Sequence, residues 1–277
     1  MASRPIQYRM ISRASVALVA LSALLRCSAT LAEEITLAVA SNFSAPMTEI
    51  VTAFESTSEH RVRVAFGSSG KLLAQIQHGA PFEAFFSADQ DKVSYLISAG
   101  SADPASRITY ARGRLILWTA NSTLAGGERQ ALESGAFRHL AIANPRLAPY
   151  GAAAMEVLHA LKLEDETRAK RVVGENIAQT YQYVASGNAQ LGFIALSQVF
   201  LNGNLTAGSG WIVPDTLHQP IRQDAVILQR DREQGRRTAT DAFWAFFQGQ
   251  QAQRIIERYG YRVGTPTQTP VEKVDAG

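Results

Sequence analysis

"RVRVAFGSSGKLLAQIQHGAPFEAFFSAD", residues 61–89, is the stretch that decides the fold. Its first six residues alternate between polar and apolar for most of their length, as a half-buried strand does. The apolar residues of "KLLAQI" then follow at helical spacing, and "EAFFSA" predicts a second strand. Two strands joined through a helix form a βαβ unit, so this stretch predicts a parallel sheet in an α/β fold.

The same rhythm continues on both sides of this unit. Further strands are predicted at "ITLAVA", "LILWTA", "HLAIAN", "QLGFIAL", "WIVP" and "AVILQR", and further helices near residues 43–54, 89–100, 151–162, 177–186, 236–248 and 250–259. The alternation predicts open, largely parallel sheets with helices on both faces. Ligands of such sheets bind beyond the carboxyl ends of the strands, so the loops that follow the strands are the place to search for a site.

The first 32 residues differ in character from the rest of the chain. Three arginines precede an apolar segment, and the small residues Thr30 and Ala32 stand at the −3 and −1 positions of a cleavage site. The apolar segment, residues 14–25, is shorter than the ~20 residues needed to span a bilayer. We therefore predict a secretory signal peptide over residues 1–32, cleaved near Ala32.

Cleavage changes what the composition implies about partners. It removes four arginines and no acidic residue, so the formal charge changes from +3 to −1. The remaining chain has no cluster of Lys and Arg of the kind that follows a phosphate backbone, so we expect no nucleic-acid partner. The single cysteine, Cys27, lies inside the signal peptide, which predicts a mature protein without disulfides or thiolate metal sites.

The loop "GSSGKL", residues 67–72, has the residue types of a phosphate-binding loop but lacks the spacing of one. A P-loop has four residues between its glycines and a Ser or Thr after its lysine. Here two serines separate Gly67 from Gly70, and Leu72 follows Lys71. Two interpretations remain: a serine that caps the helix, and an anion site at the helix N-terminus.

Three further loops present small polar residues or backbone amides where a helix begins. "ASNFS" offers Ser41 and Asn42, "PYGAAAMEVL" offers amides near Tyr150, and "GENIAQ" offers amides around Ile177. Each loop alone is an ordinary helix cap. Converging on one cleft, the four loops would form a site for a small, doubly charged oxyanion without any cationic side chain.

Patterns for catalysis and metal binding are weak in this chain. The five histidines are scattered without metal-ligand spacing, and no G-x-S-x-G motif occurs. The acidic residues show no paired arrangement suited to acid–base chemistry. We therefore expect no enzyme activity, no catalytic residue and no cofactor.

Five segments together resemble the periplasmic molybdate-binding proteins of molybdate ABC transporters: "AVASNF", "FGSSGKLLAQIQHGAPFEAFFSAD", "ANPRLAPYGAAAMEVL", "GENIAQTYQYVASGNAQLGFIALSQV" and "QAQRIIERYGY". The resemblance implies a type II periplasmic binding protein. Such a protein has two lobes, each a mixed, mainly parallel sheet flanked by helices, joined by two crossing hinge strands. Lobe 1 is then expected from residues 33–112 and 224–263, lobe 2 from residues 113–223, and a polar, disordered tail from residues 264–277.

The resemblance also implies a ligand and a partner. The ligand is molybdate or, as an alternative at the same site, tungstate. It is held between the lobes of a periplasmic monomer. The partner is the permease of an ABC importer in the inner membrane. The residues implied to contact the oxygens of the anion, rather than the metal itself, are Ser41 and Ser69 through their hydroxyls and Tyr150 and Ile177 through backbone N–H groups.

One position departs from the family pattern. Some members also contact the anion through a tyrosine in the strand after "LG", where this chain has Ala195. The chain resembles a branch of the family with asparagine after the first-loop residue, in which that asparagine supplies the missing contact. Asn42 is the candidate for this role.

Alternatives stay open at this point. A receptor for another oxyanion such as sulfate, or for a small organic anion, would share the fold, and an organic carboxylate favours a bidentate arginine, for which Arg146 is the nearest candidate. An enzyme on the same scaffold is a third class. Lys71 either lends positive field to the cleft or lies on the exposed side of its helix, and we favour the exposed side because neutral donors suffice.

Overall fold

The structure is a computed structural model that describes residues 32–229 and 234–263. The predicted signal peptide, apart from Ala32, and the predicted tail 264–277 lie outside the described residues. No helix within the described ranges is both long enough and apolar enough to cross a membrane.

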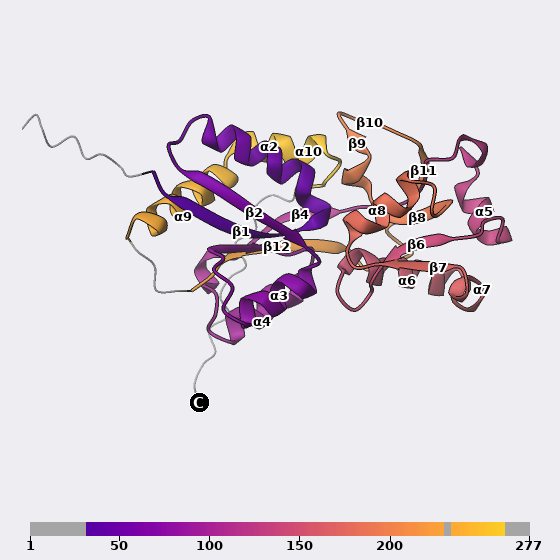
Figure 1. The fold of residues 1–277 in the computed structure, drawn as a ribbon, viewed down its shortest axis with the longest axis horizontal. Helices are drawn as coiled ribbons and strands as arrows, with labels where there is room; N and C mark the ends of the chain where they lie inside the picture. The colour runs from indigo at the N-terminus through magenta and orange to yellow at the C-terminus, as the bar shows by residue number, and fades with distance from the viewer. Residues whose placement is uncertain (1–31, 230–233, 264–277) are drawn as a thin grey trace, which may run out of the picture. The chain divides into compact units, whose positions relative to one another are not determined.

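The first lobe is built on a five-stranded sheet with the order β2-β1-β3-β12-β4 (Figure 1). Its strands are β1 (Glu34–Ala40), β2 (Arg61–Gly67), β3 (Ala84–Phe86), β4 (Ile108–Gly113) and β12 (Ile221–Ile227). Its helices are η1 (Ser41–Phe43), α2 (Ser44–Glu55), α3 (Ser69–Gln77), α4 (Asp91–Ser98), η2 (Pro104–Ser106), α9 (Gln234–Phe247) and α10 (Gln250–Arg258).

The second lobe is built on another five-stranded sheet, with the order β11-β5-β8-β6-β7. Its strands are β5 (Leu115–Thr119), β6 (Leu140–Ala143), β7 (Arg171–Gly174), β8 (Leu191–Ala195) and β11 (Ser209–Ile212). Its helices are η3 (Ser122–Leu124), α5 (Glu128–Ser134), α6 (Pro149–Ala160), α7 (Glu164–Arg168), α8 (Ile177–Ala185) and η4 (Leu196–Gln198). A short hairpin of β9 (Phe200–Leu201) and β10 (Asn204–Leu205) follows η4.

Strand direction confirms the prediction of mixed, mainly parallel sheets. In the first sheet β1 pairs in parallel with β2 and β3, and β12 pairs antiparallel with β3 and β4. In the second, β6 pairs in parallel with β7 and β8, and β5 pairs antiparallel with β8 and β11. Each sheet therefore has four strands in one direction and one strand, β12 or β5, against them.

Two strands of the five-stranded sheets escape the sequence patterns, as do both strands of the β9–β10 hairpin. β4 reads "ITYARG" and mixes polar with apolar residues, and β7 has only four residues at the edge of its sheet. Both are held by pairing with neighbours rather than by a periodic pattern of their own. The lobe boundaries predicted at residues 112 and 223 stay a prediction.

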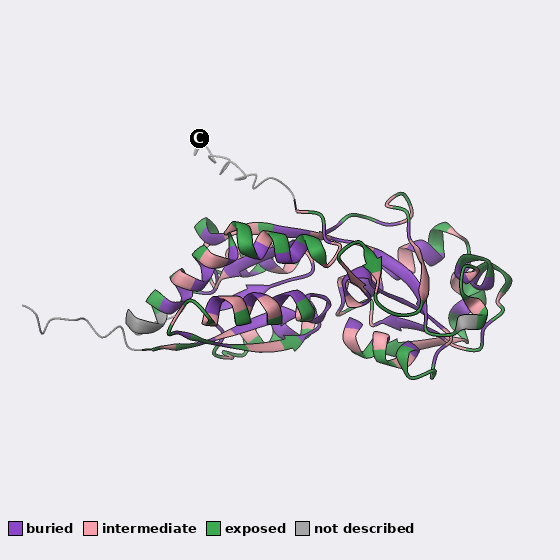
Figure 2. Cartoon of the chain, turned by 90° about the horizontal axis from the view of Figure 1, so that it is seen from above, coloured by how far each residue is buried: buried purple, intermediate pink, exposed green. Residues whose placement is uncertain are grey.

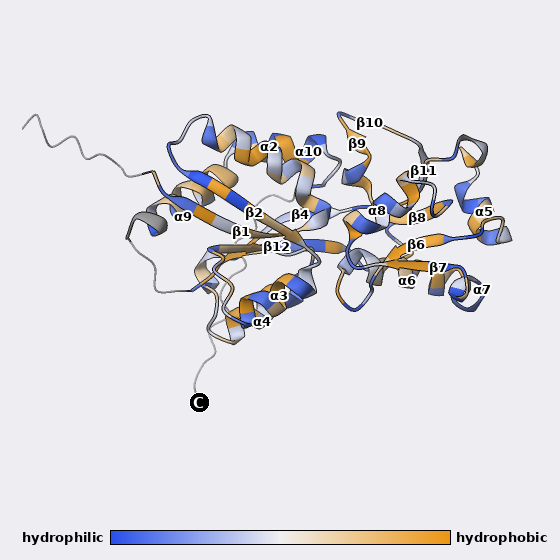
Figure 3. Cartoon of the chain, viewed as in Figure 1, coloured by the Kyte–Doolittle hydropathy of each residue, from blue (hydrophilic) through white to orange (hydrophobic). Residues whose placement is uncertain are grey.

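The core of the first lobe lies on both faces of its sheet. In β1, Leu37 and Val39 pack with the side of the sheet covered by α2 and α9, whereas Ala38 packs on the side covered by α3 and α4. This alternation is the expected period of a strand. Figure 2 shows the strands as buried beneath helices that expose only their outer sides, and Figure 3 shows hydrophobic colour on β6 and β8 and hydrophilic residues on the edge strand β2.

The chain passes between the two sheets twice. β4 leads to β5 through Arg114, and β11 leads to β12 through residues 213–220. These two crossings lie where the resemblance to periplasmic binding proteins implied the hinge strands. They bring the carboxyl end of β1, the start of α6 and η4 near one another, which is where the candidate site lies.

Candidate functional site

The four predicted loops, together with Ala88 after β3, meet at one small cavity between the lobes. The first lobe contributes η1, directly after β1, and the loop from β2 into α3, and the second lobe contributes the first residues of α6 and of α8. All five residues predicted for the site line this cavity: Ser41, Asn42, Ser69, Tyr150 and Ile177. Each of them is 4% exposed or less. The structure therefore brings together residues up to 136 positions apart in the sequence.

Ser69 is oriented by the first lobe itself. Its Oγ accepts a hydrogen bond from the backbone N–H of Ala88 at 2.9 Å. A hydroxyl has one proton to donate, and this contact leaves that proton free. Ser69 is thus positioned to donate a hydrogen bond into the cavity.

The start of α8 leaves one backbone donor available. The N-cap residue Asn176 accepts through Oδ1 from the N–H groups of Ala178 and Gln179, both at 3.0 Å. The N–H of Ile177, the first residue of α8, has no acceptor among the described residues. This N–H group carries the positive end of the helix dipole to the cavity.

The start of α6 has a similar arrangement. Pro149 occupies the first helical position, where its missing N–H costs no hydrogen bond, and Tyr150 follows it. The N–H of Tyr150 has no acceptor within the described part of the chain, whereas the N–H of Gly151 donates to Ala148 O at 2.9 Å. The second lobe therefore presents two backbone N–H donors, on Tyr150 and Ile177.

The electrostatic character of the cavity is neutral. Of the described residues that line it, none carries a charged side chain. Burial raises the pKa of the Tyr150 phenol well above its usual value, so this hydroxyl is uncharged at neutral pH. The described wall of the cavity thus consists of hydroxyl groups, backbone amides and apolar side chains, without cation or carboxylate.

Lys71 lies outside the cavity and its side chain is about half exposed. Its Nζ pairs with Glu175, which precedes α8 in the other lobe. Close by, the N–H of Gly70 donates to Leu147 O at 2.9 Å, again from one lobe to the other. The exposed interpretation of Lys71 fits this placement, and the lobes are in contact across the cavity.

Asn42 takes part in a buried network beneath the cavity. Its Nδ2 donates to Gln223 Oε1 at 2.8 Å and to Tyr261 Oη at 2.9 Å, so both amide protons have acceptors. Its backbone carbonyl accepts from Ser197 Oγ and from Tyr261 Oη, each at 2.8 Å. The donor that Asn42 still offers to the cavity is its backbone N–H.

The same network reaches the hinge. Gln223 lies on β12, accepts from Tyr110 Oη at 2.9 Å, and donates through Nε2 to Tyr150 Oη at 3.1 Å. Sequence reasoning missed Gln223, Tyr110, Tyr261 and Ser197 as members of this network. No pattern could have found them, because the bonded pairs are 64 to 219 residues apart.

Two other positions discussed from the sequence lie away from the cavity. Ala195 ends β8, is fully buried and does not line the cavity. Arg146 is exposed and lines a neighbouring cavity instead. No arginine is among the described residues that line the candidate site.

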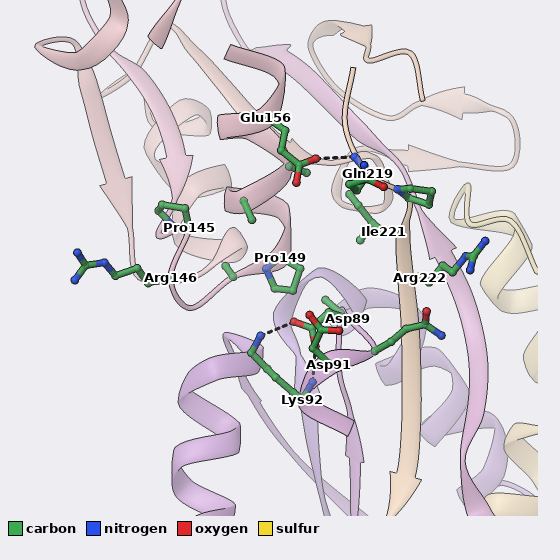
Figure 4. Close-up of a pocket in the computed structure, with 16 residues that line it drawn as sticks. Asp89, Asp91, Lys92, Pro145, Arg146, Pro149, Glu156, Gln219, Ile221 and Arg222 are labelled. Carbon is green, nitrogen blue, oxygen red and sulfur yellow. Dashed lines mark hydrogen bonds and ion pairs between the residues drawn. The ribbon is translucent and has the colours of Figure 1, made fainter. Parts of the chain in front are cut away.

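That neighbouring cavity has a volume of about 330 Å³ and lies between α4, α6 and the segment before β12 (Figure 4). Its wall carries the carboxylates of Asp89, Asp91 and Glu156. Asp89 pairs with Lys92, and Glu156 accepts from the N–H of Gln219 at 2.6 Å. Lys92, Arg146 and Arg222 line it as well, so its wall mixes both signs of charge, unlike the uncharged wall of the candidate site. Within the described residues no group of three or more His, Cys, Asp or Glu is placed to hold a metal ion.

Comparison with known proteins agrees with the geometry. A model of the bacterial extracellular solute-binding protein family matches residues 35–262. The chain is 47% identical over 243 residues to the molybdate-binding protein ModA of Azotobacter vinelandii. The match covers 88% of this chain and 95% of that protein. It is 42% identical over 230 residues to ModA of Rhodobacter capsulatus, covering 83% and 88%. The solved structure of the A. vinelandii periplasmic molybdate-binding protein superposes with a TM-score of 0.79 at 36% identity, covering 83% of this chain and all of that one.

Proposed function

This chain belongs to the bacterial extracellular solute-binding protein family, and we propose that it captures molybdate between its lobes and delivers it to an ABC importer. It is a transport receptor rather than an enzyme, as its molybdate-binding relatives are. The observation that carries the proposal is the neutral cavity to which both lobes contribute hydrogen-bond donors.

The chemistry of the cavity matches a tetrahedral dianion. Molybdate has four acceptor oxygens and, at neutral pH, no proton, so every contact it makes needs a donor from the protein. We assign these donors to the hydroxyls of Ser41 and Ser69 and to the backbone N–H groups of Asn42, Tyr150 and Ile177. In a buried site, hydrogen bonds to the charged oxygens are strong, and the helix dipoles add positive potential.

The assignment of Asn42 follows from its neighbours. Because both protons of its side-chain amide are used by Gln223 and Tyr261, the contact made in place of the tyrosine missing at Ala195 comes from the backbone of Asn42. The side chain then has a different role, which is to fix the η1 turn.

Closure of the lobes is the second half of the proposed function. An anion that contacts η1 and α3 on one side and α6 and α8 on the other binds the closed state better than the open one. We propose that a permease in the inner membrane recognises the closed, monomeric receptor. This assigns the mature protein to the periplasm, after removal of the signal peptide.

Tungstate has the same charge and shape as molybdate and is proposed as a second ligand. Sulfate has the same charge but shorter bonds, so its oxygens would leave some donors of the cavity unpaired. Unpaired buried donors are costly, and size selection follows from that cost. Since no arginine is among the described residues of the cavity wall, an organic carboxylate is disfavoured.

Calorimetric titration of the mature protein with molybdate, tungstate, sulfate and phosphate tests this function. We expect tight binding of molybdate and tungstate and weak or undetectable binding of sulfate and phosphate. Tight binding of sulfate alone, or no binding of any of the four, would contradict the proposal.

A further inference from the structure

The hydroxyl of Ser68 is not used by the fold. Ser68 is the N-cap residue of α3, with extended backbone angles (φ −69°, ψ 145°), and it is 3% exposed. A serine at this position ordinarily accepts a hydrogen bond from the N–H of the second or third helical residue. Here the side chain makes no such bond, and its buried Oγ has no hydrogen-bond partner among the described residues.

The reason lies in the contact between the lobes. The N–H of Gly70, the second residue of α3, donates to Leu147 O in the other lobe. One of the two N–H groups that usually donate to an N-cap hydroxyl is therefore taken, and the other, that of Lys71, makes no bond to the Ser68 hydroxyl either. The neighbouring Ser69 differs, because its Oγ already accepts from the N–H of Ala88. Of two adjacent buried serines, one is held by the protein and the other is not.

A buried hydroxyl without a partner is costly, so its persistence calls for an explanation. Ser68 lines the same cavity as Ser41 and Ser69. In a cavity surrounded by donors, an oxyanion is the acceptor that a free hydroxyl lacks. We propose that Ser68 Oγ donates a hydrogen bond to the bound anion, as a contact beyond those assigned above.

This inference rests on the proposed function and sharpens it. The pair Ser68 and Ser69 would present two side-chain donors from a single turn of chain, with Ser69 oriented by Ala88 and Ser68 free to rotate toward the nearest anion oxygen. Discrimination against smaller anions would then depend on Ser68 as well, because its hydroxyl returns to an unpaired state when the anion oxygens are out of reach.

The test separates a ligand contact from a helix cap through the choice of substitution. Ser68→Gly removes the hydroxyl but retains a residue that is well tolerated at an N-cap, whereas Ser68→Ala removes both the hydroxyl and the capping preference. Ser68→Thr retains the hydroxyl. Each variant is titrated with molybdate, and its thermal unfolding is measured without anion. Ser186→Ala, at the exposed end of α8, is the matched control.

We expect Ser68→Gly and Ser68→Ala to weaken molybdate binding about tenfold or more, as loss of a hydrogen bond to a charged group does. We expect Ser186→Ala to bind like wild type, and Ser68→Thr, which retains the hydroxyl, to bind more tightly than Ser68→Ala. If Ser68→Gly binds like wild type, the hydroxyl is no ligand, whether or not Ser68→Ala is impaired. If the wild-type protein binds no molybdate, the proposed function fails, and that result is distinct from a wild type that binds while Ser68→Gly matches it.

Discussion

At the residue scale, the site depends on which groups still have a proton to donate. Ser69 is the clearest case, because the N–H of Ala88 occupies its acceptor side and leaves its proton for the cavity. Ile177 is the backbone counterpart, since Asn176 caps the two N–H groups that follow it and not its own. Local hydrogen bonds therefore decide which donors remain free to face the cavity.

Ser69→Ala is expected to weaken molybdate binding by more than about 1 kcal/mol, in line with the contribution of a hydrogen bond to a charged group. It also leaves the N–H of Ala88 without its acceptor in the free and the bound protein alike, which lowers stability rather than affinity. Isothermal titration of this variant beside Ser186→Ala measures the effect. An affinity equal to wild type would remove Ser69 from the site.

The sequence predicted which residues line the cavity, but it could not predict how each of them is bonded. Ser41, Ser69, Tyr150 and Ile177 all stand where a loop follows a strand or opens a helix, and fold topology brings such positions together. The sequence could not show that the hydroxyl of Ser69 is bonded and that of Ser68 is not, because the hydrogen bonds concerned involve Ala88 and Leu147, outside the loop. Nor could it show that the amide of Asn42 is already bonded.

At the scale of elements, α3 begins with a close contact to the opposite lobe. A Cβ added at Gly70 would lie 3.0 Å from Leu147 Cα and 3.1 Å from Leu147 O. Glycine at this position lets two backbones approach closely enough for the Gly70 to Leu147 hydrogen bond. The closeness of the lobes therefore depends on a missing side chain.

Gly70→Ala is expected to lower the affinity for molybdate without lowering the stability of the protein. Crowding against the backbone of Leu147 should weaken molybdate binding by about 1–3 kcal/mol, the usual cost of overpacking. With the lobes apart there is no crowding, and alanine is the better helix former by up to ~1 kcal/mol. The free energy of unfolding without anion should thus stay level or rise, as urea titration would show. Unchanged affinity would mean that the lobes adjust without cost.

At the scale of the whole molecule, the lobes are joined by buried hydrogen bonds and by an exposed ion pair. Lys71 and Glu175 form an ion pair between them, with side chains 53% and 48% exposed. Ion pairs this exposed contribute about 0.2–1 kcal/mol and are screened by salt. This pair supports closure without deciding it.

A double-mutant cycle with Lys71→Ala, Glu175→Ala and the double variant checks this statement. We expect a coupling energy for molybdate binding below about 1 kcal/mol, which declines as salt is added. A coupling of several kcal/mol that resists salt would instead make Lys71 part of the binding machinery.

The buried tyrosines predict how the whole molecule responds to alkali. Burial raises the pKa of Tyr261 to about 12 and raises those of Tyr110 and Tyr150 well above the ordinary value near 10. Between those pH values the unfolded chain loses phenol protons that the native state retains, so stability falls as pH rises. The contribution of Tyr261 is fully present below about pH 10 and is lost by about pH 12, an effect on the order of 2–3 kcal/mol.

Urea unfolding at a series of pH values from about 9 to 11.5 measures this decline. Tyr261→Phe, which has no proton to lose, should be less stable at neutral pH, because Asn42 loses a partner, yet should decline less steeply in alkali. Equal slopes for the two proteins would show that the decline arises elsewhere.

The burial of the site has a kinetic consequence. Buried residues line the cavity from both lobes, so an anion that both lobes hold can leave when the lobes separate. The rate at which the anion leaves is then tied to the rate at which the lobes part, and hydrogen bonds from the anion to both lobes slow that separation. An importer that separates the lobes would therefore release the anion, and no chemical step is needed.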